Sequence, residues 1–462
     1  MKTISVIKSL TYQGDMAPLL KLSIPLVLTG FMQSAIGFFE NIFLSRLGPD
    51  YLAAGALVGW FYATLIVMIF GTLGAVNVLV AHKHGKKDIH GIANVWRDGL
   101  LFALVLVPPV FFLVWNMAPL FLLVGQHPHL VNLASHYLHA LAFGLLPKLI
   151  MMVIIDALLG LGLARTITIF TVLTIPLYVF FSWVLIFGKF GFPALGIAGA
   201  GWGMTLGDWI ASILICVYVL LDKQFRPYFR LLFSLKKPFY ILDMIKLGLP
   251  MGLMYCIEVG FFLAMTLLMG VINIQSVAAN QVTMQYLGPL MGSIFSIAQA
   301  LTIRMGHEIG AKQIATAERA VYAAVCMVAV YMCVMAVIYW LMPDTLIAVD
   351  FNMTAASNVE TIKLARDFIF IAALFQIIEA VRITLYGALR GLKDTHFSLL
   401  ASVISFWFIA LPIGYVTAIH FKFGGVGFWW GMVIGACCSV FLLSGRFKRK
   451  MHATVAASLH AV

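Results

Sequence analysis

The sequence predicts an all-α integral membrane protein with twelve transmembrane helices in two pseudo-symmetric six-helix bundles around a central cleft. Three observations carry this prediction: the composition, the length of the apolar runs and an internal repeat. Of the 462 residues, 62% are hydrophobic and only 10% are Asp, Glu, Lys or Arg, whereas soluble domains carry roughly 25% charged residues. A water-facing surface needs more charge than this, so the composition excludes soluble enzymes and nucleic-acid binders.

Twelve apolar runs reach the length of about 20 residues that a helix needs to cross a bilayer. They are continuous, whereas the strands of outer-membrane barrels alternate between apolar and polar residues, so helices are expected. The expected spans are 17–45, 52–81, 95–117, 131–158, 166–188, 197–221, 240–270, 277–305, 318–342, 362–388, 396–419 and 425–445. The first run leads directly into the rest of the protein, so no cleaved signal peptide is expected.

Lys and Arg fall on alternate connections between these spans. Loops 82–98, 222–239 and 304–319 are basic, as is the tail, whereas loops 118–130 and 271–276 have no Lys or Arg. Because basic residues collect on the cytoplasmic side of a membrane, both termini are expected in the cytoplasm. The same rule accounts for the net charge of +12 without a nucleic-acid partner.

The second half of the chain repeats the first at a nearly constant offset. Pro25 and Pro250 are separated by 225 residues, and the same offset joins Ala53-Ala54 to Ala278-Ala279, His82 to His307 and Gly85 to Gly310. Further pairs have an offset of 228: Gly196 with Gly424, Gly199 with Gly427, Trp202 with Trp430 and Gly203 with Gly431. Each half holds six spans, an even number, so equivalent loops face the same side and the repeat is parallel.

The repeat defines the expected domains. They are an N-terminal six-helix lobe at 1–221, a basic cytoplasmic linker at 222–239, a C-terminal six-helix lobe at 240–445 and a cytoplasmic tail at 446–462. Paired bundles with a cleft between them are typical of secondary transporters. A duplicated scaffold without moving parts is the alternative.

Three glutamates lie inside the apolar spans: Glu40, Glu258 and Glu379. An ionisable group at membrane depth is costly unless it is paired or hydrated, and it is functional by default. The helix rise of about 1.5 Å per residue allows Glu258 and Glu379 to share one level of the second bundle, whereas Glu40 lies in the first. Two close carboxylates in a low dielectric favour uptake of a proton, a metal cation or an organic cation. A structural carboxyl bonded to a neighbouring polar group is the alternative for each.

Other charged residues bear on these sites. Arg382 follows Glu379 by three residues and shares its helix face, so it is able to hold that carboxyl ionised. Asp208 in the sixth span is able to pair across helices.

Polar and aromatic side chains near the glutamates are candidates to line a cavity for flat organic cations. Interhelical hydrogen bonds are the alternative for the polar ones. The candidates are Gln33, Phe38, Asn41, Tyr255, Asn280, Gln281 and Tyr286.

Six segments carry a resemblance to a known family: Phe187–Gly191, Gly196–Gly201, Pro250–Glu258, Val277–Val282, Ile303–Gly310 and Tyr386–Thr395. Together they resemble multidrug and toxic compound extrusion transporters, and the resemblance is closest to the bacterial NorM-type branch. It implies a monomeric, multi-pass protein of the bacterial inner membrane that exports small cationic organic molecules in exchange for Na⁺ or H⁺, without a cofactor. By the same resemblance Glu40, Glu258 and Glu379 are coupling residues, Na⁺ is the candidate metal at Glu258 and Glu379, and Gln281 lines the cavity.

Other functions remain as alternatives. A flippase of the same superfamily for a lipid-linked precursor commonly needs a strongly basic cavity, whereas the intramembrane charges here are mostly acidic. A membrane prenyl transferase would need clustered Asp residues that hold Mg²⁺, and no D-D-x-x-D motif occurs. A channel would need a filter loop or a ring of charges, and the sequence has neither.

Overall fold

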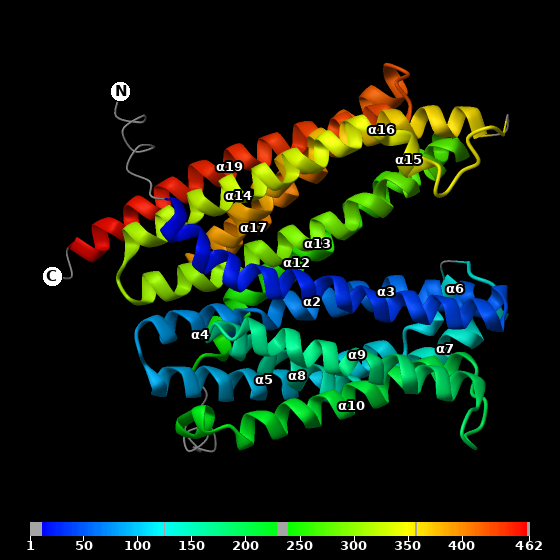
Figure 1. Ribbon diagram of the computed structural model, residues 1–462. Helices are drawn as coiled ribbons and strands as arrows, with labels where there is room; N and C mark the ends of the chain where they lie inside the picture. The colour runs from blue at the N-terminus through cyan, green and yellow to red at the C-terminus, as the bar shows by residue number, and fades with distance from the viewer. Residues whose placement is uncertain (1–11, 124, 229–238, 356–357, 460–462) are drawn as a thin grey trace. The chain divides into compact units, whose positions relative to one another are not determined.

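The computed structural model describes residues 12–123, 125–228, 239–355 and 358–459, and it is helical through most of these ranges (Figure 1). Within them, eleven helices are long and apolar enough to cross a membrane. The number becomes twelve when the bent pair Pro128–Ala142 and Leu145–Gly160 is taken as one span. The predicted all-α fold with twelve spans is therefore confirmed.

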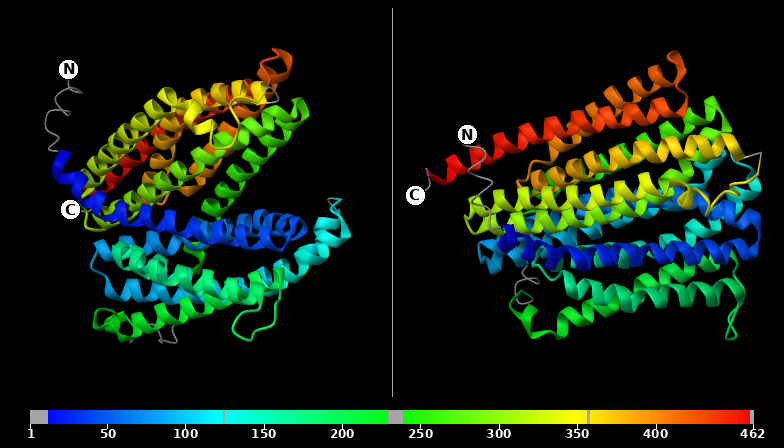
Figure 2. Two further views of the ribbon diagram at one scale, coloured as in Figure 1. Left: turned by 45° about the vertical axis from the view of Figure 1, so that its right-hand side comes forward. Right: turned by 45° about the horizontal axis from the view of Figure 1, so that its top comes forward.

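The described chain divides into two compact units. Unit 2 is Leu28–Gly252, and unit 1 is Leu253–Val462 with the chain up to Val27. The helices of the first half are α2 (Tyr12–Leu47), α3 (Pro49–Leu73), α4 (Ala75–Gly85), α5 (Ile89–Trp115), α6 (Ala118–Leu123), α7 (Pro128–Ala142), α8 (Leu145–Gly160), α9 (Ala164–Phe187), α10 (Ile197–Leu221) and η1 (Lys223–Phe225). Those of the second half are α12 (Ile241–Ile272), α13 (Ile274–Gly310), α14 (Ile314–Leu341), α15 (Pro343–Ile347), α16 (Val359–Gly391), α17 (Thr395–Ser402), η3 (Val403–Ala410), α18 (Leu411–Tyr415), η4 (Val416–His420) and α19 (Gly425–Leu459). Figure 2 shows these helices from two further directions.

Both unit boundaries fall inside helices. Helix α2 belongs to unit 1 up to Val27, and helix α12 belongs to unit 2 up to Gly252. These crossings are 225 residues apart, which is the offset of the repeat. The domain limits expected at 221 and 240 stay a prediction, because residues 229–238 of the linker lie outside the described residues, as do 460–462 of the tail. Helix α19 continues through most of that tail, to Leu459.

A stripe of glycines on α10 brings that helix against α9 in unit 2. A Cβ at Gly199 would lie 2.4 Å from the carbonyl oxygen of Leu185, and a Cβ at Gly203 would lie 2.4 Å from the Cα of Ser182. Small residues four positions apart let helix backbones approach closely in membrane proteins. The two helices therefore pack backbone to backbone.

The equivalent stripe on α19 has the same role in unit 1. A Cβ at Gly427 would lie 2.5 Å from the backbone nitrogen of Ala418, and one at Gly431 would lie 2.6 Å from the carbonyl oxygen of Ala410. Equivalent glycines thus make equivalent close contacts in both units. The predicted pseudo-symmetric repeat is confirmed by this packing.

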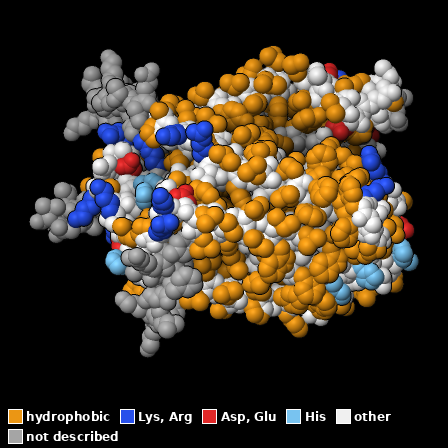
Figure 3. Space-filling view, turned by 60° about the horizontal axis from the view of Figure 1, so that its bottom comes forward, with side chains coloured by type: hydrophobic (Ala, Val, Ile, Leu, Met, Phe, Trp, Pro, Cys, Tyr) orange, Lys and Arg blue, Asp and Glu red, His pale blue; other side chains and the backbone are white. Residues whose placement is uncertain are grey.

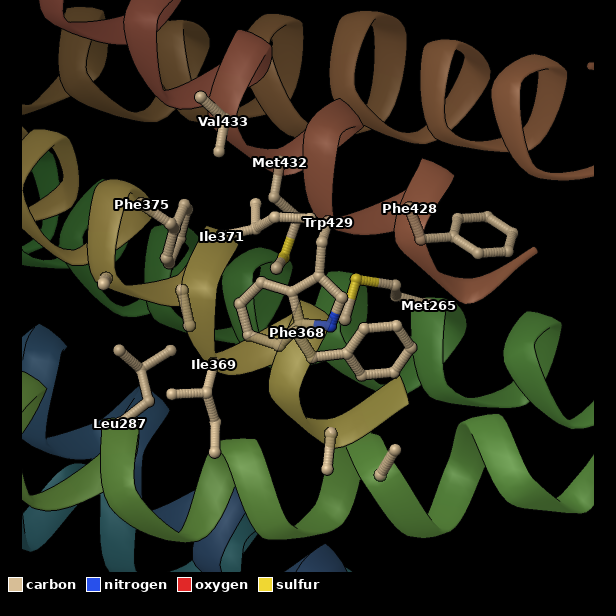
Figure 4. Close-up of a cluster of buried hydrophobic side chains, with 14 of the residues drawn as sticks. Met265, Leu287, Phe368, Ile369, Ile371, Phe375, Phe428, Trp429, Met432 and Val433 are labelled. Carbon is tan, nitrogen blue, oxygen red and sulfur yellow. The ribbon is translucent and has the colours of Figure 1, made fainter. Parts of the chain in front are cut away.

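Helix α16 is the central helix of unit 1 and packs against α13, α14 and α19. Figure 4 shows Phe368 and Phe375 of this helix beside Trp429 of α19, with ring centroids 6.1 and 6.2 Å from the indole. Met265 from α12 joins the same cluster of buried side chains. This apolar core fixes the helix that carries Glu379 and Arg382.

The outward-facing sides of several helices are apolar. Phe112 of α5 is 70% exposed and Phe441 of α19 is 78% exposed. On the face drawn in Figure 3, hydrophobic side chains cover the middle, and Lys and Arg side chains gather toward one end. Extensive exposed apolar surface of this kind indicates contact with lipid.

A buried carboxylate of α5 anchors the start of α12. Asp98 Oδ2 accepts hydrogen bonds from the backbone N–H groups of Phe239, at 2.7 Å, and Tyr240, at 2.8 Å. Its Oδ1 accepts one from Arg97 Nη2 at 2.7 Å. A negative charge is favourable at the N-terminus of a helix, so Asp98 holds the two residues that precede α12 in place.

Replacing Asp98 with Ala removes the acceptor of both backbone donors and the ion-pair partner of Arg97. We expect this change to lower the free energy of unfolding by about 3 kcal/mol. Thermal unfolding of the purified protein in detergent measures it. Asp50→Ala is the matched control, because that exposed carboxylate lies 3.6 Å from an exposed His129 and is expected to contribute nothing measurable. Equal unfolding temperatures for the two variants would contradict the anchoring role.

Candidate functional site

A buried guanidinium joins two of the three predicted glutamates in unit 1. Arg382 Nε donates to Glu379 Oε2 at 2.6 Å, and its Nη2 donates to the other oxygen of the same carboxylate. Its Nη1 donates to Glu258 Oε1 at 2.7 Å. Helix α16 supplies Arg382 and Glu379 one turn apart, and α12 supplies Glu258. The structure therefore brings the predicted pair together, with Arg382 between the carboxylates.

Two hydroxyl groups complete this arrangement, which we call the unit 1 cluster: Glu258, Glu379, Arg382, Tyr386, Ser402 and Phe406. Tyr386 accepts a hydrogen bond from Arg382 Nη1 and is itself hydrogen-bonded to Ser402. Ser402 donates to Glu258 Oε1 at 3.0 Å. The hydrogen bonds thus close a ring from the guanidinium through both hydroxyls to the Glu258 carboxylate.

The residues from the eleventh span lie where its helix widens. Ser402 ends α17, and Phe406 lies in η3, which is π-helical, as is η4. Pro412 has no backbone N–H to donate to the preceding turn, which favours a departure from regular α-helix in this span. Single π-helical turns in α-helices occur frequently at functional sites.

Glu40 lies in unit 2 and has a neutral partner. The hydroxyl of Tyr137, from α7, donates to Glu40 Oε1. The positive charge of Lys148 also acts on Glu40 through space. Glu40 therefore has a hydrogen-bond donor but no direct ion pair among the described residues.

A buried ion pair lies in the same unit. Lys148 Nζ of α8 is 3.1 Å from Asp208 Oδ2 of α10, and Tyr178 of α9 donates to Asp208 Oδ1 at 2.9 Å. Lys148 Nζ also lies 5.4 Å from the ring centroid of Tyr62. The expectation that Asp208 pairs across helices is confirmed. With Glu40 and Tyr137 these residues form the unit 2 cluster.

The fourth span is broken beside this cluster. The sequence predicted one helix over 131–158, but α7 and α8 meet at an angle of 52°. Gly144 lies at the break, where a Cβ would come 2.9 Å from Thr205 Oγ1 and 3.1 Å from Asp208 Oδ2. Thr205 donates to the carbonyl of Ala140 at 2.7 Å, so α10 satisfies a backbone group that the break frees. Broken helices of this kind line binding sites in secondary transporters.

The predicted cavity residues fall into two groups. Gln33, Phe38, Asn41 and Gln281 are exposed. The others make hydrogen bonds inside unit 1. Asn280 Nδ2 donates to Thr266 Oγ1 at 3.2 Å, the Tyr286 hydroxyl donates to the Leu346 carbonyl at 2.8 Å, and the Tyr255 hydroxyl accepts from Arg390 at 2.9 Å. Asn280 Oδ1 has no hydrogen-bond partner among the described residues. These residues thus make hydrogen bonds between helices, and their place in a cavity stays a prediction.

Sequence reasoning missed Lys148 and the tyrosines of the unit 2 cluster. Lys148 had a usable signal, because it is a basic residue inside an apolar run, 131–158, where an ionisable group marks a site. Tyr62, Tyr137 and Tyr178 had none, since a tyrosine in an apolar helix is usual.

Two duplicated helical units with ionisable clusters inside their membrane spans are typical of the class of secondary membrane transporters. The MatE family model matches residues 25–184 and 250–416, two stretches that begin 225 residues apart. The chain belongs to this family, the multidrug and toxic compound extrusion transporters, and the predicted resemblance is confirmed.

Curated relatives match nearly the whole chain. It is 29% identical to "Probable multidrug resistance protein NorM" of Brucella suis over 97% of this chain and 96% of that protein. It is 31% identical to the protein of the same name from Pseudomonas aeruginosa, over 94% and 90% of the two chains.

Solved structures share the fold. A eukaryotic MATE transporter superposes with a TM-score of 0.83 at 18% identity and covers 96% of this chain and 98% of its own. An outward-facing multidrug resistance MATE family transporter gives 0.85 at 20% identity, with 95% and 96% coverage.

The Lys148–Asp208 pair makes a testable contribution to stability. Lys148→Met leaves a buried carboxylate without its ion-pair partner, and we expect a loss of about 3 kcal/mol in the free energy of unfolding. The double variant Lys148→Met/Asp208→Leu removes both charges and is expected to recover most of it. Thermal unfolding of both proteins measures this, and a double variant no more stable than the single one would contradict the assignment.

Proposed function

We propose that this chain is a secondary active antiporter that exports cationic or amphipathic drugs and toxic organic compounds in exchange for Na⁺ or H⁺. Its membership of the MatE family supports this proposal, as do the names of its curated relatives. The observation that carries the proposal furthest is the charge of the two clusters. Each contains two carboxylic acids and one basic side chain inside membrane-spanning helices.

An unbalanced carboxylate inside a membrane needs a positive partner. If each acid is ionised and each base protonated, a cluster has a formal charge of −1. A proton or Na⁺ neutralises that charge, and so does a cationic substrate. Competition between these partners gives exchange of one for the other across the membrane, which is antiport. A flippase for a lipid-linked pyrophosphate is disfavoured, because net negative clusters repel such a substrate.

We propose Glu40, Glu258 and Glu379 as the coupling residues. Of these, Glu40 is the best placed to exchange a proton, because its hydrogen-bond partner is the neutral Tyr137 hydroxyl. Protonation of Glu40 therefore breaks no direct salt bridge. The exposed cavity candidates Gln33, Phe38, Asn41 and Gln281 are proposed to contact the substrate.

The proposed setting is the bacterial inner membrane, with both termini in the cytoplasm. The basic connection α4–α5, which carries Lys83, Lys86 and Lys87, supports this orientation. We propose that the protein works as a monomer, without a cofactor or nucleic-acid partner, and that it has no enzymatic activity.

Transport by purified protein in proteoliposomes tests the coupling ion. Ethidium efflux is measured under an imposed pH gradient or an imposed Na⁺ gradient, each alone. Glu40→Gln is expected to reduce proton-driven efflux to the level of protein-free liposomes, because the amide cannot exchange a proton. Glu360→Gln, at an exposed carboxyl in the first turn of α16, is the matched control. Efflux that depends on neither gradient would contradict antiport.

Glu258→Gln tests the unit 1 cluster in cells. The change removes the carboxylate that accepts from both Arg382 and Ser402, and we expect ethidium export to be abolished. The measurement is cellular ethidium fluorescence at matched membrane abundance, again with Glu360→Gln as the control. Export equal to that of the parent would remove Glu258 from the mechanism.

A further inference from the structure

The place between Glu258 and Glu379 is already filled by a cation of the protein itself. A guanidinium has five N–H donors. Four hydrogen bonds run from Arg382: two to Glu379, one to Glu258 and one to Tyr386. A side chain that meets both carboxylates in this way occupies the position a bound metal or organic cation would take.

The surroundings hold this guanidinium in place. Arg382 is only 1% exposed, and its Cζ lies 4.6 Å from the ring centroid of Tyr386 and 4.7 Å from that of Phe406. Aromatic faces attract a delocalised cation most strongly where water is excluded. A guanidinium also stays protonated in proteins, so Arg382 keeps its positive charge when the pH changes.

We propose that Arg382 is a built-in cation that closes the Glu258–Glu379 site to Na⁺ and to protons, and that it thereby decides the coupling ion of this transporter. The inference rests on the proposed antiport function and deepens it. With Arg382 in place, both carboxylates of unit 1 are hydrogen-bonded to one fixed positive charge that fills the space between them, and one formal negative charge remains on the cluster when both are ionised. This narrows the coupling role proposed above for all three glutamates: exchange of the coupling ion is left to Glu40 in unit 2, and Glu258 and Glu379 hold Arg382 in place.

Removal of Arg382 would uncover a site suited to a monovalent cation. Glu258 and Glu379 would supply carboxylate oxygens, and Ser402 a hydroxyl. One turn before Glu379, the fully buried Gln376 has no hydrogen-bond partner for its amide among the described residues, so its oxygen is uncommitted. Oxygen donors of these types are the ones that hard cations prefer.

The first test measures binding without transport. The full chain is purified as the parent and as Arg382→Gln, and thermal unfolding is followed in NaCl and in N-methyl-D-glucamine chloride of equal ionic strength. We expect no Na⁺-specific shift for the parent. For Arg382→Gln we expect a rise of about 3 °C in the unfolding temperature when Na⁺ is well above its dissociation constant. A folded Arg382→Gln without this rise would overturn the proposal.

Two further variants separate the charge from the loss of an arginine. Arg382→Lys keeps a cation between the carboxylates and is expected to behave like the parent. Arg390→Gln removes a second arginine of the same helix. Arg390 donates to the neutral Tyr255 hydroxyl and not to a carboxylate, so this variant is expected to create no Na⁺ response. A Na⁺-specific shift in either variant would count against the proposal.

A second measurement uses the parent protein and does not require Arg382→Gln to fold. Hydrophobic carbodiimides modify protonated carboxyl groups inside membranes, and peptide mass spectrometry locates the product. We expect modification at Glu40 and none at Glu258 or Glu379. Modification of Glu258 or Glu379 that Na⁺ slows would show an open cation site in the parent and would overturn the proposal.

These measurements distinguish failure of the Arg382 proposal from failure of the proposed antiport function. If Na⁺ stabilises only Arg382→Gln but efflux depends on neither gradient, the antiport proposal fails, whereas the closure of the Glu258–Glu379 site to Na⁺ by Arg382 stands. If efflux follows a Na⁺ gradient and the parent shows Na⁺-protected modification at Glu258, antiport stands and the role of Arg382 fails.

Discussion

Charge inside membrane-spanning helices must find a partner within the protein, and the neighbourhood of each cluster reflects this constraint. In unit 1 the partner is Arg382, which meets two carboxylates and two aromatic faces. In unit 2 the partner is Lys148 of α8, which forms an ion pair with Asp208 of α10. Since an isolated charge in hydrocarbon is costly, neither base nor its carboxylate partners can be changed alone without consequence for the helices around it.

Local rules were enough to find the charges of unit 1. Apolar runs of about 20 residues identify membrane helices, and an acid within such a run is conspicuous. Glu258 and Glu379 were placed at one level from the rise per residue, and the spacing from Glu379 to Arg382 predicted their contact. These inferences use only positions along single helices, which the sequence contains in full.

The missing parts depend on contacts between helices far apart in sequence. The pairing of Tyr137 with Glu40 spans 97 residues. The break between α7 and α8 was also missed, although Pro147, three residues after Gly144, is a local signal for it, since a proline has no backbone N–H to donate to the preceding turn. Asp208 on α10 approaches Gly144 so closely that a Cβ at this position would lie 3.1 Å from its Oδ2, which favours a glycine there. The hydrogen bond from the Tyr286 hydroxyl to a carbonyl 60 residues away was not predicted either.

The crossing of α2 and α12 between units bears on how the two halves assemble. Severed between α10 and α12, the first fragment would lack Gly248, whose Cα packs so closely on Thr72 that a Cβ there would lie 1.9 Å from its carbonyl oxygen. The second fragment would lack Leu26, whose carbonyl accepts from Ser296 at 3.4 Å. Each fragment would have to borrow a helix end from the other, as domain-swapped protomers do. The duplicated halves have thus become mutually dependent for folding, although each descends from the same six-helix pattern.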